Sequence, residues 1–353
     1  MSHLHIDTAE GWRETAPAAN APELLVEEAG RLHLLGSNLK LKHDFGAVGP
    51  VDCPIAYDPV RRLAFRYVCA PGFQRGDFSQ LRVFSLSRKE SYPLIELPLN
   101  QWVLWLLEWI SLPEVGTGQL FGLSAVDRPV EDQIVIEHRL FSAKPGEAQL
   151  RLRPLCRDAY KPLALSYLRC ELVFAGAEGI YLLGMNGERK LTLPSGIGAG
   201  GQGAAFCPQG SARVAIGGDG LHLWDLACNS CHRLTRNGRY PVWAPDGKGI
   251  WYRESSADLH YYDLEQEASR KIIELPDQRH PEFWHARAVS LSSCGRYVAT
   301  SLSEKVLRGM SQKGSATGQR ERVYLHNQCL CVLDLERREF WQRPGFANHL
   351  HWV

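Results

Sequence analysis

Three histidines near the end of the chain have the residue type and spacing that suit a metal centre. His285 precedes a strand-like segment, and His349 and His351 stand two positions apart near the C-terminus. Side chains two positions apart on a strand share a face, so the later pair points the same way. If the two segments are neighbours in the fold, the three imidazoles converge and suit Mn, Fe, Ni or Zn. The alternative is that all three are histidines at the starts of strands, hydrogen-bonded to the backbone.

Other short motifs lack the structural context that their chemistry needs. Cys228-x-x-Cys231-His232 matches the attachment motif of c-type haem, but it falls where the repeat described below requires a turn, so we predict no covalent haem. Gly198–Gly203 has the spacing of a dinucleotide-binding loop, yet a short strand and Pro208 follow it instead of a helix. No G-x-S-x-G elbow, P-loop or H-E-x-x-H occurs. These observations predict no cofactor and favour a protein that is not an enzyme.

A basic insertion at residues 303–325 is the second candidate site. Its cationic residues are Lys305, Arg308, Lys313, Arg320 and Arg322. Such an insertion is either a solvated hairpin or loop, or a docking arm for an acidic protein partner. Aromatic residues are not interleaved with the charges, so nucleic-acid binding is not favoured.

Composition and charge narrow the class of protein. The chain has 353 residues, 44% hydrophobic and 22% charged, with a formal net charge of +1. This is typical of a core-forming chain without a general attraction to nucleic acid or acidic membranes. The N-terminus shows no signal-peptide pattern, and the most apolar stretch, Trp102–Ile110, is shorter than the roughly 20 residues that span a bilayer. Ten scattered cysteines suit reduced thiols, so we expect a cytoplasmic protein without a membrane partner.

The elements that would position these residues repeat along the chain. Gly203–Thr235 and Tyr240–Leu275 each contain a strand, a Pro-x-Gly turn, a second strand, a third strand ending in aromatic-Asp-Leu, and a fourth strand. A third copy begins at Ala288. Looser copies are Pro54–Leu97, Trp102–Leu155 and Leu163–Leu193. A period of about 40 residues with four strands per unit predicts an all-β fold, a β-propeller.

The two ends of the chain predict how the propeller closes. Residues 22–46 resemble three outer strands without an inner one, and residues 349–353 resemble an inner strand alone. Joined, they make one blade shared between the termini and a closed ring of about seven four-stranded blades. We therefore predict a disordered tail at 1–21 and a single propeller domain at 22–353, two unrelated β domains being the alternative. Within it, Trp102–Ile110 is interpreted as a strand, with an amphipathic helix as the alternative.

Two resemblances to known families support and extend this prediction. Residues 240–253 (YPVWAPDGKGIWYR) and 258–265 (DLHYYDLE) resemble the TolB-type and WD40-like repeats of bacterial proteins, which implies the propeller fold. Trp284-His285 and His349-x-His351 resemble the ligand pattern of the oligogalacturonate lyases. That resemblance implies a manganese ion held by the three histidines, which would neutralise a uronate carboxylate for β-elimination. The chain departs from that pattern at Leu350, where the family has proline, and at Phe346, where it has glutamine.

The leading hypothesis is a non-catalytic scaffold that binds proteins through its axial face and the 303–325 insertion. The alternative is a metal-dependent polysaccharide lyase of the oligogalacturonate type with His285, His349 and His351 as ligands.

Overall fold

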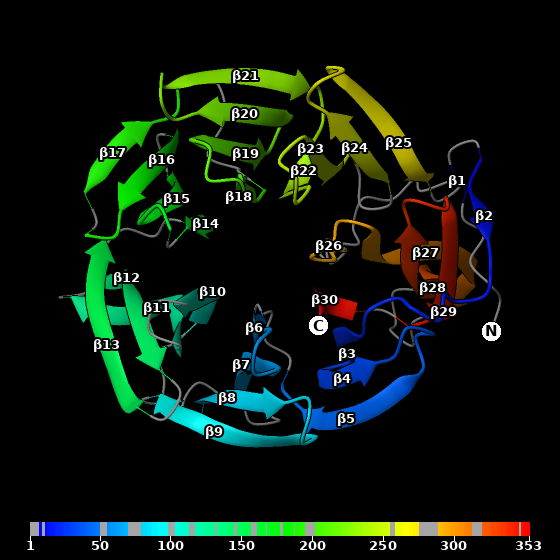
Figure 1. Cartoon of the computed structure of the whole chain (residues 1–353), viewed down its shortest axis with the longest axis horizontal. Helices are drawn as coiled ribbons and strands as arrows, with labels where there is room; N and C mark the ends of the chain where they lie inside the picture. Colours follow the sequence, from blue (N-terminus) through cyan, green and yellow to red (C-terminus); the bar gives the residue numbers. More distant parts are fainter. Residues whose placement is uncertain are drawn as a thin grey trace.

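The computed structural model describes residues 7–8, 11–49, 55–69, 79–97, 103–112, 117–130, 133–144, 147–156, 161–166, 168–176, 179–186, 188–194, 202–254, 258–274, 289–312, 320–345 and 347–353. The elements in these residues are β-strands, which form seven sheets arranged around a centre (Figure 1). The predicted all-β organisation in four-stranded units is confirmed. In this part of the chain no helix is long and apolar enough to cross a membrane.

The sheets are numbered here in chain order. Sheet 1 contains β30 (Ala347–Trp352), β3 (Leu24–Glu28), β4 (Arg31–Leu35) and β5 (Leu41–Ala47). Sheet 2 contains β6 (Ala56–Asp58), β7 (Leu63–Cys69), β8 (Ser79–Ser85) and β9 (Glu90–Leu97). Sheet 3 contains β10 (Val103–Leu112), β11 (Thr117–Val130), β12 (Gln133–Lys144) and β13 (Glu147–Cys156). Sheet 4 contains β14 (Lys161–Ser166), β15 (Glu171–Gly176), β16 (Gly179–Gly184) and β17 (Arg189–Thr192).

The remaining three sheets come from the clearest sequence repeats. Sheet 5 contains β18 (Ala204–Phe206), β19 (Arg213–Gly217), β20 (Leu221–Asp225) and β21 (Ser230–Thr235). Sheet 6 contains β22 (Arg239–Trp243), β23 (Gly249–Arg253), β24 (Leu259–Asp263) and β25 (Ala268–Glu274), with β1 (Asp7–Thr8) at its outer edge. Sheet 7 contains β26 (Val289–Leu291), β27 (Tyr297–Gln312), β28 (Arg320–Asp334) and β29 (Glu339–Pro344), with β2 (Arg13–Glu14) at its outer edge.

Two recurring turns explain why the repeats are visible in the sequence. The turn between the first and second strands of sheets 5, 6 and 7 has Gly210, Gly247 and Gly295 at φ of 70°, 70° and 73°. Glycine takes this left-handed conformation without steric cost. After the third strand, the aspartate of each aromatic-Asp-Leu triplet accepts hydrogen bonds from backbone N–H groups of the turn, as Asp263 does from Glu265 and Gln266 at 3.0 Å each. The aspartate therefore fixes the turn into the fourth strand.

Alternation along the strands builds the core between neighbouring sheets. On β28, Leu330 and Val332 pack toward sheet 1, whereas Cys331 and Leu333 pack toward sheet 6. This is the two-residue period of a strand buried on both faces. Such clusters of buried side chains lie between neighbouring sheets in the described residues.

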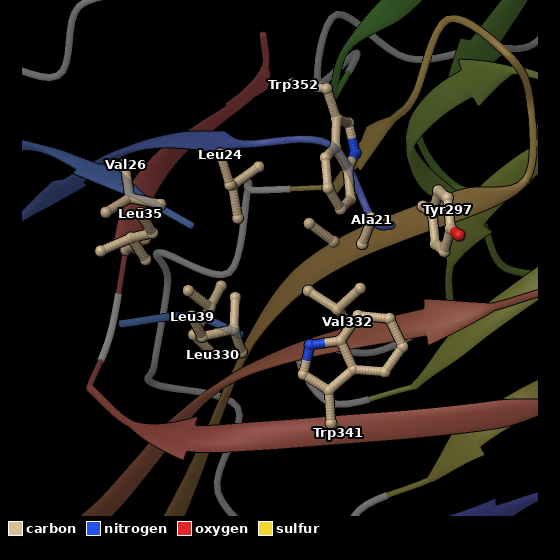
Figure 2. Close-up of a cluster of buried hydrophobic side chains, with 12 residues drawn as sticks. Ala21, Leu24, Val26, Leu35, Leu39, Tyr297, Leu330, Val332, Trp341 and Trp352 are labelled. Atoms are coloured by element: carbon tan, nitrogen blue, oxygen red, sulfur yellow. The ribbon is translucent and has the colours of Figure 1, made fainter. Parts of the chain in front are cut away.

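The C-terminal strand lies in the same sheet as the first large strands of the chain. β30 pairs antiparallel with β3, with Leu350 opposite Val26, and β3 pairs in turn with β4. Figure 2 shows the cluster between sheets 7 and 1, in which Trp352 and Trp341 lie on either side of a group of aliphatic side chains. The indole N–H of Trp352 donates to the carbonyl of Ser290 at 2.9 Å, which ties the last strand to sheet 7.

The N-terminal segment differs from its prediction as a disordered tail. β1 pairs with the outer edge of β25, and β2 pairs in parallel with β29. Trp12 packs against the cluster between sheets 6 and 7, and the N–H of Arg13 donates to the carbonyl of Arg338 at 3.1 Å. The outer strands of both sheets have free edges that this segment completes, and the indole adds apolar contact.

The interpretation of the apolar stretch as a strand is confirmed for its described residues. β10 covers Val103–Leu112 and pairs with β11, and it is the strand of sheet 3 nearest the centre in Figure 1. Trp102 lies outside the described residues.

Candidate functional site

Two of the three predicted ligand histidines lie in the described part of the chain. His285 lies outside it. His349 and His351 are on β30, opposite Glu27 and Leu25 of β3. Leu25 belongs to the cluster between sheets 1 and 2, so this face of sheet 1 is turned toward sheet 2.

The surroundings of His349 are dominated by a buried ion pair. Its Nε2 lies 4.0 Å from Oε2 of Glu27. The Glu27 carboxylate accepts a hydrogen bond from Arg66 of β7, and the side chains of Glu27 and Arg66 are 1% and 0% exposed. Arg66 also donates to the carbonyls of Val48 and Tyr67, at 3.2 and 3.0 Å. Because a buried carboxylate requires a compensating cation, the Glu27 charge is used to join sheets 1 and 2.

His351 has an aromatic environment. Its ring lies edge-on to that of Tyr57, with the centroids 5.5 Å apart, and burial lowers the pKa of His351 to about 4. The imidazole is therefore neutral near pH 7, which suits both a metal ligand and a packed side chain. The Glu27 carboxylate, which lies near His349, is held by Arg66. The described residues thus supply two imidazoles on one face but do not complete the predicted three-histidine set.

The basic insertion forms part of a long two-stranded hairpin. β27 and β28 stay in register from Tyr297↔Asp334 to Gln312↔Arg320, whereas β29 pairs with β28 only over Cys329–Asp334. The part beyond Leu302 and Cys329 therefore extends past the sheet, and we call it the basic hairpin. On it Lys305 is opposite His326, and Arg322 is opposite Met310.

The two-residue period places the cationic positions of this hairpin with respect to one another. On β28, Arg320, Arg322 and His326 are separated by even numbers of residues, so these positions belong to one face of the hairpin. Lys305 of β27 belongs to the same face because it is directly opposite His326. Arg308 lies at the register shift between Leu307 and Gly309. Lys313 lies outside the described residues. The backbone alone thus gathers three cationic positions on one face of the hairpin.

A group that sequence analysis missed lies at the connection between β23 and β24. One ligand atom each from Glu254, Asp258 and His260 lies within 4.8 Å of the others. Two carboxylates and an imidazole are donors that a divalent cation accepts. Next to them, burial lowers the pKa of Arg253 to about 10, while the charge of Asp258 acts to raise it. The buried guanidinium and a bound cation would therefore compete for Asp258.

The missed group has a counterpart that the sequence repeats do reveal. A Leu-His pair begins the third strand of sheets 5 and 6, at Leu221-His222 and Leu259-His260. Nε2 of His222 lies 3.2 Å from Oδ1 of Asp219, and burial is the largest influence on the lowered pKa of His222. A histidine next to an acidic residue at this point is therefore a repeated feature, and aligning the copies would have shown it.

The haem-like motif lies at the turn that the repeat requires. Cys228 is in the turn between β20 and β21, where its Sγ is 3.0 Å from Oγ of Ser230, and Cys231 is on β21. Both cysteines are free thiols.

Comparisons with known proteins show the fold and not a family. No family model matches the chain, and no curated protein matches it. A solved structure of the dihydro-heme d1 dehydrogenase NirN in complex with DHE has a TM-score of 0.55 and 14% identity, and the match covers 97% of this chain and 78% of that one. An oligogalacturonate lyase in complex with manganese has a TM-score of 0.54 and 12% identity, covering 92% and 96%. The oligogalacturonate lyase of Vibrio parahaemolyticus has a TM-score of 0.54 and 9% identity, covering 85% and 95%. At these identities the likeness concerns architecture alone, and it is a β-propeller architecture that the chain shares with them.

Proposed function

We propose that this chain is a closed, seven-bladed β-propeller acting as a non-catalytic scaffold, and that an acidic protein partner binds its axial face and the basic hairpin. The observation that carries the proposal is the projection of β27 and β28 beyond sheet 7. At about 3.3 Å per residue, residues 303–312 span about 30 Å. Cationic positions on one face of such a projection suit an acidic protein surface.

The scaffold is favoured over the lyase alternative by the surroundings of the late histidines. The Glu27 carboxylate near His349 is held by Arg66, and His351 packs on Tyr57. These contacts account for both side chains as parts of the packing between sheets 1 and 2. The cytoplasm remains the predicted compartment of this scaffold.

The test is capture of partners by the full chain, with identification by cross-linking and mass spectrometry. The first variant replaces Lys305, Arg320 and Arg322 by glutamate, and a matched control replaces the exposed Arg88 and Lys89 of the turn between β8 and β9 by glutamate. We expect partners whose capture weakens with added salt, whose cross-links fall on residues 303–325, and which only the hairpin variant loses. Retention of every partner after deletion of residues 305–322 would remove the basic hairpin from the proposal.

A further inference from the structure

A cavity of about 750 Å³ lies between sheets 6 and 7 under the N-terminal segment. Its volume is within the range of about 300–1,000 Å³ that is typical of small-molecule sites. It is lined by Trp12, by strands and turns of sheet 6, and by the turns of sheet 7 that carry Cys294 and Arg338. These are the turns between first and second and between third and fourth strands, so the cavity is at the opposite end of the strands from the basic hairpin.

One wall of the cavity is a row of side chains across three strands. Trp251 of β23 is directly opposite Tyr261 of β24, and Tyr261 is directly opposite Arg270 of β25, so all three share a face. The rings of Trp251 and Tyr261 have centroids 5.0 Å apart. Trp251 is 3% exposed, whereas the Arg270 side chain is 52% exposed. The row therefore runs from a buried indole, through a phenol, to a cation at the mouth.

Gly249 makes room for this row. A Cβ atom at this position would overlap with the hydroxyl and ring of Tyr261. The glycine lets the phenol of Tyr261 lie over β23, next to Trp251, where it lines the cavity.

The charges around the mouth are of both signs. Arg270, Arg338 and Asp246 line the cavity, and Lys271 lines it from a position opposite His260, on the other face of sheet 6 from Arg270. Arg270 is bound to Asp263 at 3.0 Å, so it is held in place at the end of the row. Arg338 lies against Gly11, where a Cβ atom would be 3.4 Å from its Nη1.

Trp12 of the N-terminal segment also lines the cavity. Its backbone is fixed by the hydrogen bond from Arg13 to Arg338 and by the parallel pairing of β2 with β29. Three aromatic side chains around a cavity of this size, those of Trp12, Trp251 and Tyr261, suit a flat ring.

We propose that this cavity binds a small planar aromatic molecule that carries a negative charge, with its ring against Trp12, Trp251 and Tyr261 and its acidic group at Arg338. The site is independent of the proposed scaffold function, since it is made by the other end of the strands. Cys294 lies at its edge as an exposed thiol and provides a reporter. Burial acts to raise the pKa of Cys294, but the hydrogen bond from Ser292 and backbone N–H groups outweigh it and lower that pKa.

The test uses 8-anilinonaphthalene-1-sulfonate as the probe and N-phenyl-1-naphthylamine as its uncharged counterpart, with the full chain. We expect saturable fluorescence with one probe per chain, and at least tenfold weaker binding of the uncharged compound. Arg338→Glu and Trp12→Ala should each weaken the sulfonate about tenfold, which corresponds to one good aromatic or charged contact. The control Arg88→Glu, on the remote exposed turn of sheet 2, should leave the affinity unchanged.

Alkylation of cysteines by iodoacetamide locates the bound probe without any substitution. At saturating sulfonate the rate at Cys294 should fall about tenfold, while the rate at the exposed Cys228 of sheet 5 stays the same. Equal affinity of the two probes would overturn the anionic part of the proposal. Unprotected Cys294, or equal losses in Arg338→Glu and Arg88→Glu, would overturn the site itself.

Discussion

The buried ion pair between Glu27 and Arg66 gives the sharpest test of how sheets 1 and 2 are joined. Replacing Arg66 by methionine removes the cation and leaves the Glu27 carboxylate, 1% exposed, in the interior. Removing one partner of a buried pair costs about 3–5 kcal/mol. The hydrogen bonds from Arg66 to the carbonyls of Val48 and Tyr67 are lost as well. Each carbonyl is then left without this donor, at a cost of roughly 1 kcal/mol. We expect the free energy of unfolding to fall by about 5–7 kcal/mol, a large part of the roughly 5–15 kcal/mol of a typical domain.

Urea unfolding followed by tryptophan fluorescence measures this loss. The double variant Glu27→Met/Arg66→Met should recover most of it, because two apolar side chains replace a buried pair at little net cost. The matched control is Arg88→Met, whose partner Glu90 is 3.4 Å away in a pair 79% and 50% exposed. Its loss should stay below about 1 kcal/mol. If Arg66→Met costs no more than Arg88→Met, the two sheets are not joined by this pair.

Three further outcomes follow from the same contacts. Deleting residues 347–353 removes β30, including Leu350 and Trp352 of the core between sheets 7 and 1, and should abolish cooperative thermal unfolding; an unchanged melting temperature would refute the pairing of β30 with β3. Burial lowers the pKa of His351 to about 4, against about 6.5 in the unfolded chain, so the unfolded chain binds a proton more readily than the folded one. The free energy of unfolding should therefore fall by up to about 3 kcal/mol as the pH drops from 6.5 to 4. This decline should be shallower in His351→Leu, and equal declines in the variant and the original chain would contradict the prediction. Burial raises the pKa of Cys329 to about 12 and that of Cys331 well above its usual value. After alkylation of the native protein at pH 8, peptide mapping should therefore find both cysteines unmodified and Cys294 modified. Early labelling of Cys331 would contradict its burial.

The strand repeats could be predicted because turn chemistry leaves a local signature. Asp225 and Asp263 each accept hydrogen bonds from N–H groups two or three residues later, which explains why the third strand ends in an aspartate in both of these copies. Gly210 and Gly247 are required by their left-handed φ. Both constraints lie within a few residues of the chain and survive even where the strands themselves vary.

The N-terminal segment left no such signature. β1 and β2 have two residues each, too few for any period, and their places are set by the edges of β25 and β29, more than 250 positions away. Trp12 was the available signal, since a tryptophan in a polar segment usually needs a surface to cover.

The metal prediction shows the same limit for sites. The two-residue spacing correctly placed His349 and His351 on one face of β30. It carried no information on Arg66, which comes from another sheet and takes the nearby carboxylate of Glu27. The spacing of residues along a strand predicts which side chains share a face of that strand. The residues that they contact, and so their chemistry, depend on how the sheets pack against each other.

The strands β27 and β28 connect the two proposed sites. One end of the pair, from Ser303 to Gln312 and from Arg320 to Gln328, forms the basic hairpin; the other end leads into the turns that carry Cys294 and Arg338 of the cavity. Between these ends, Thr300 and Ser301 receive the buried guanidinium of Arg253 from sheet 6, which fixes sheets 6 and 7 to each other. A partner on the basic hairpin and a ligand in the cavity would therefore contact opposite ends of the same two strands.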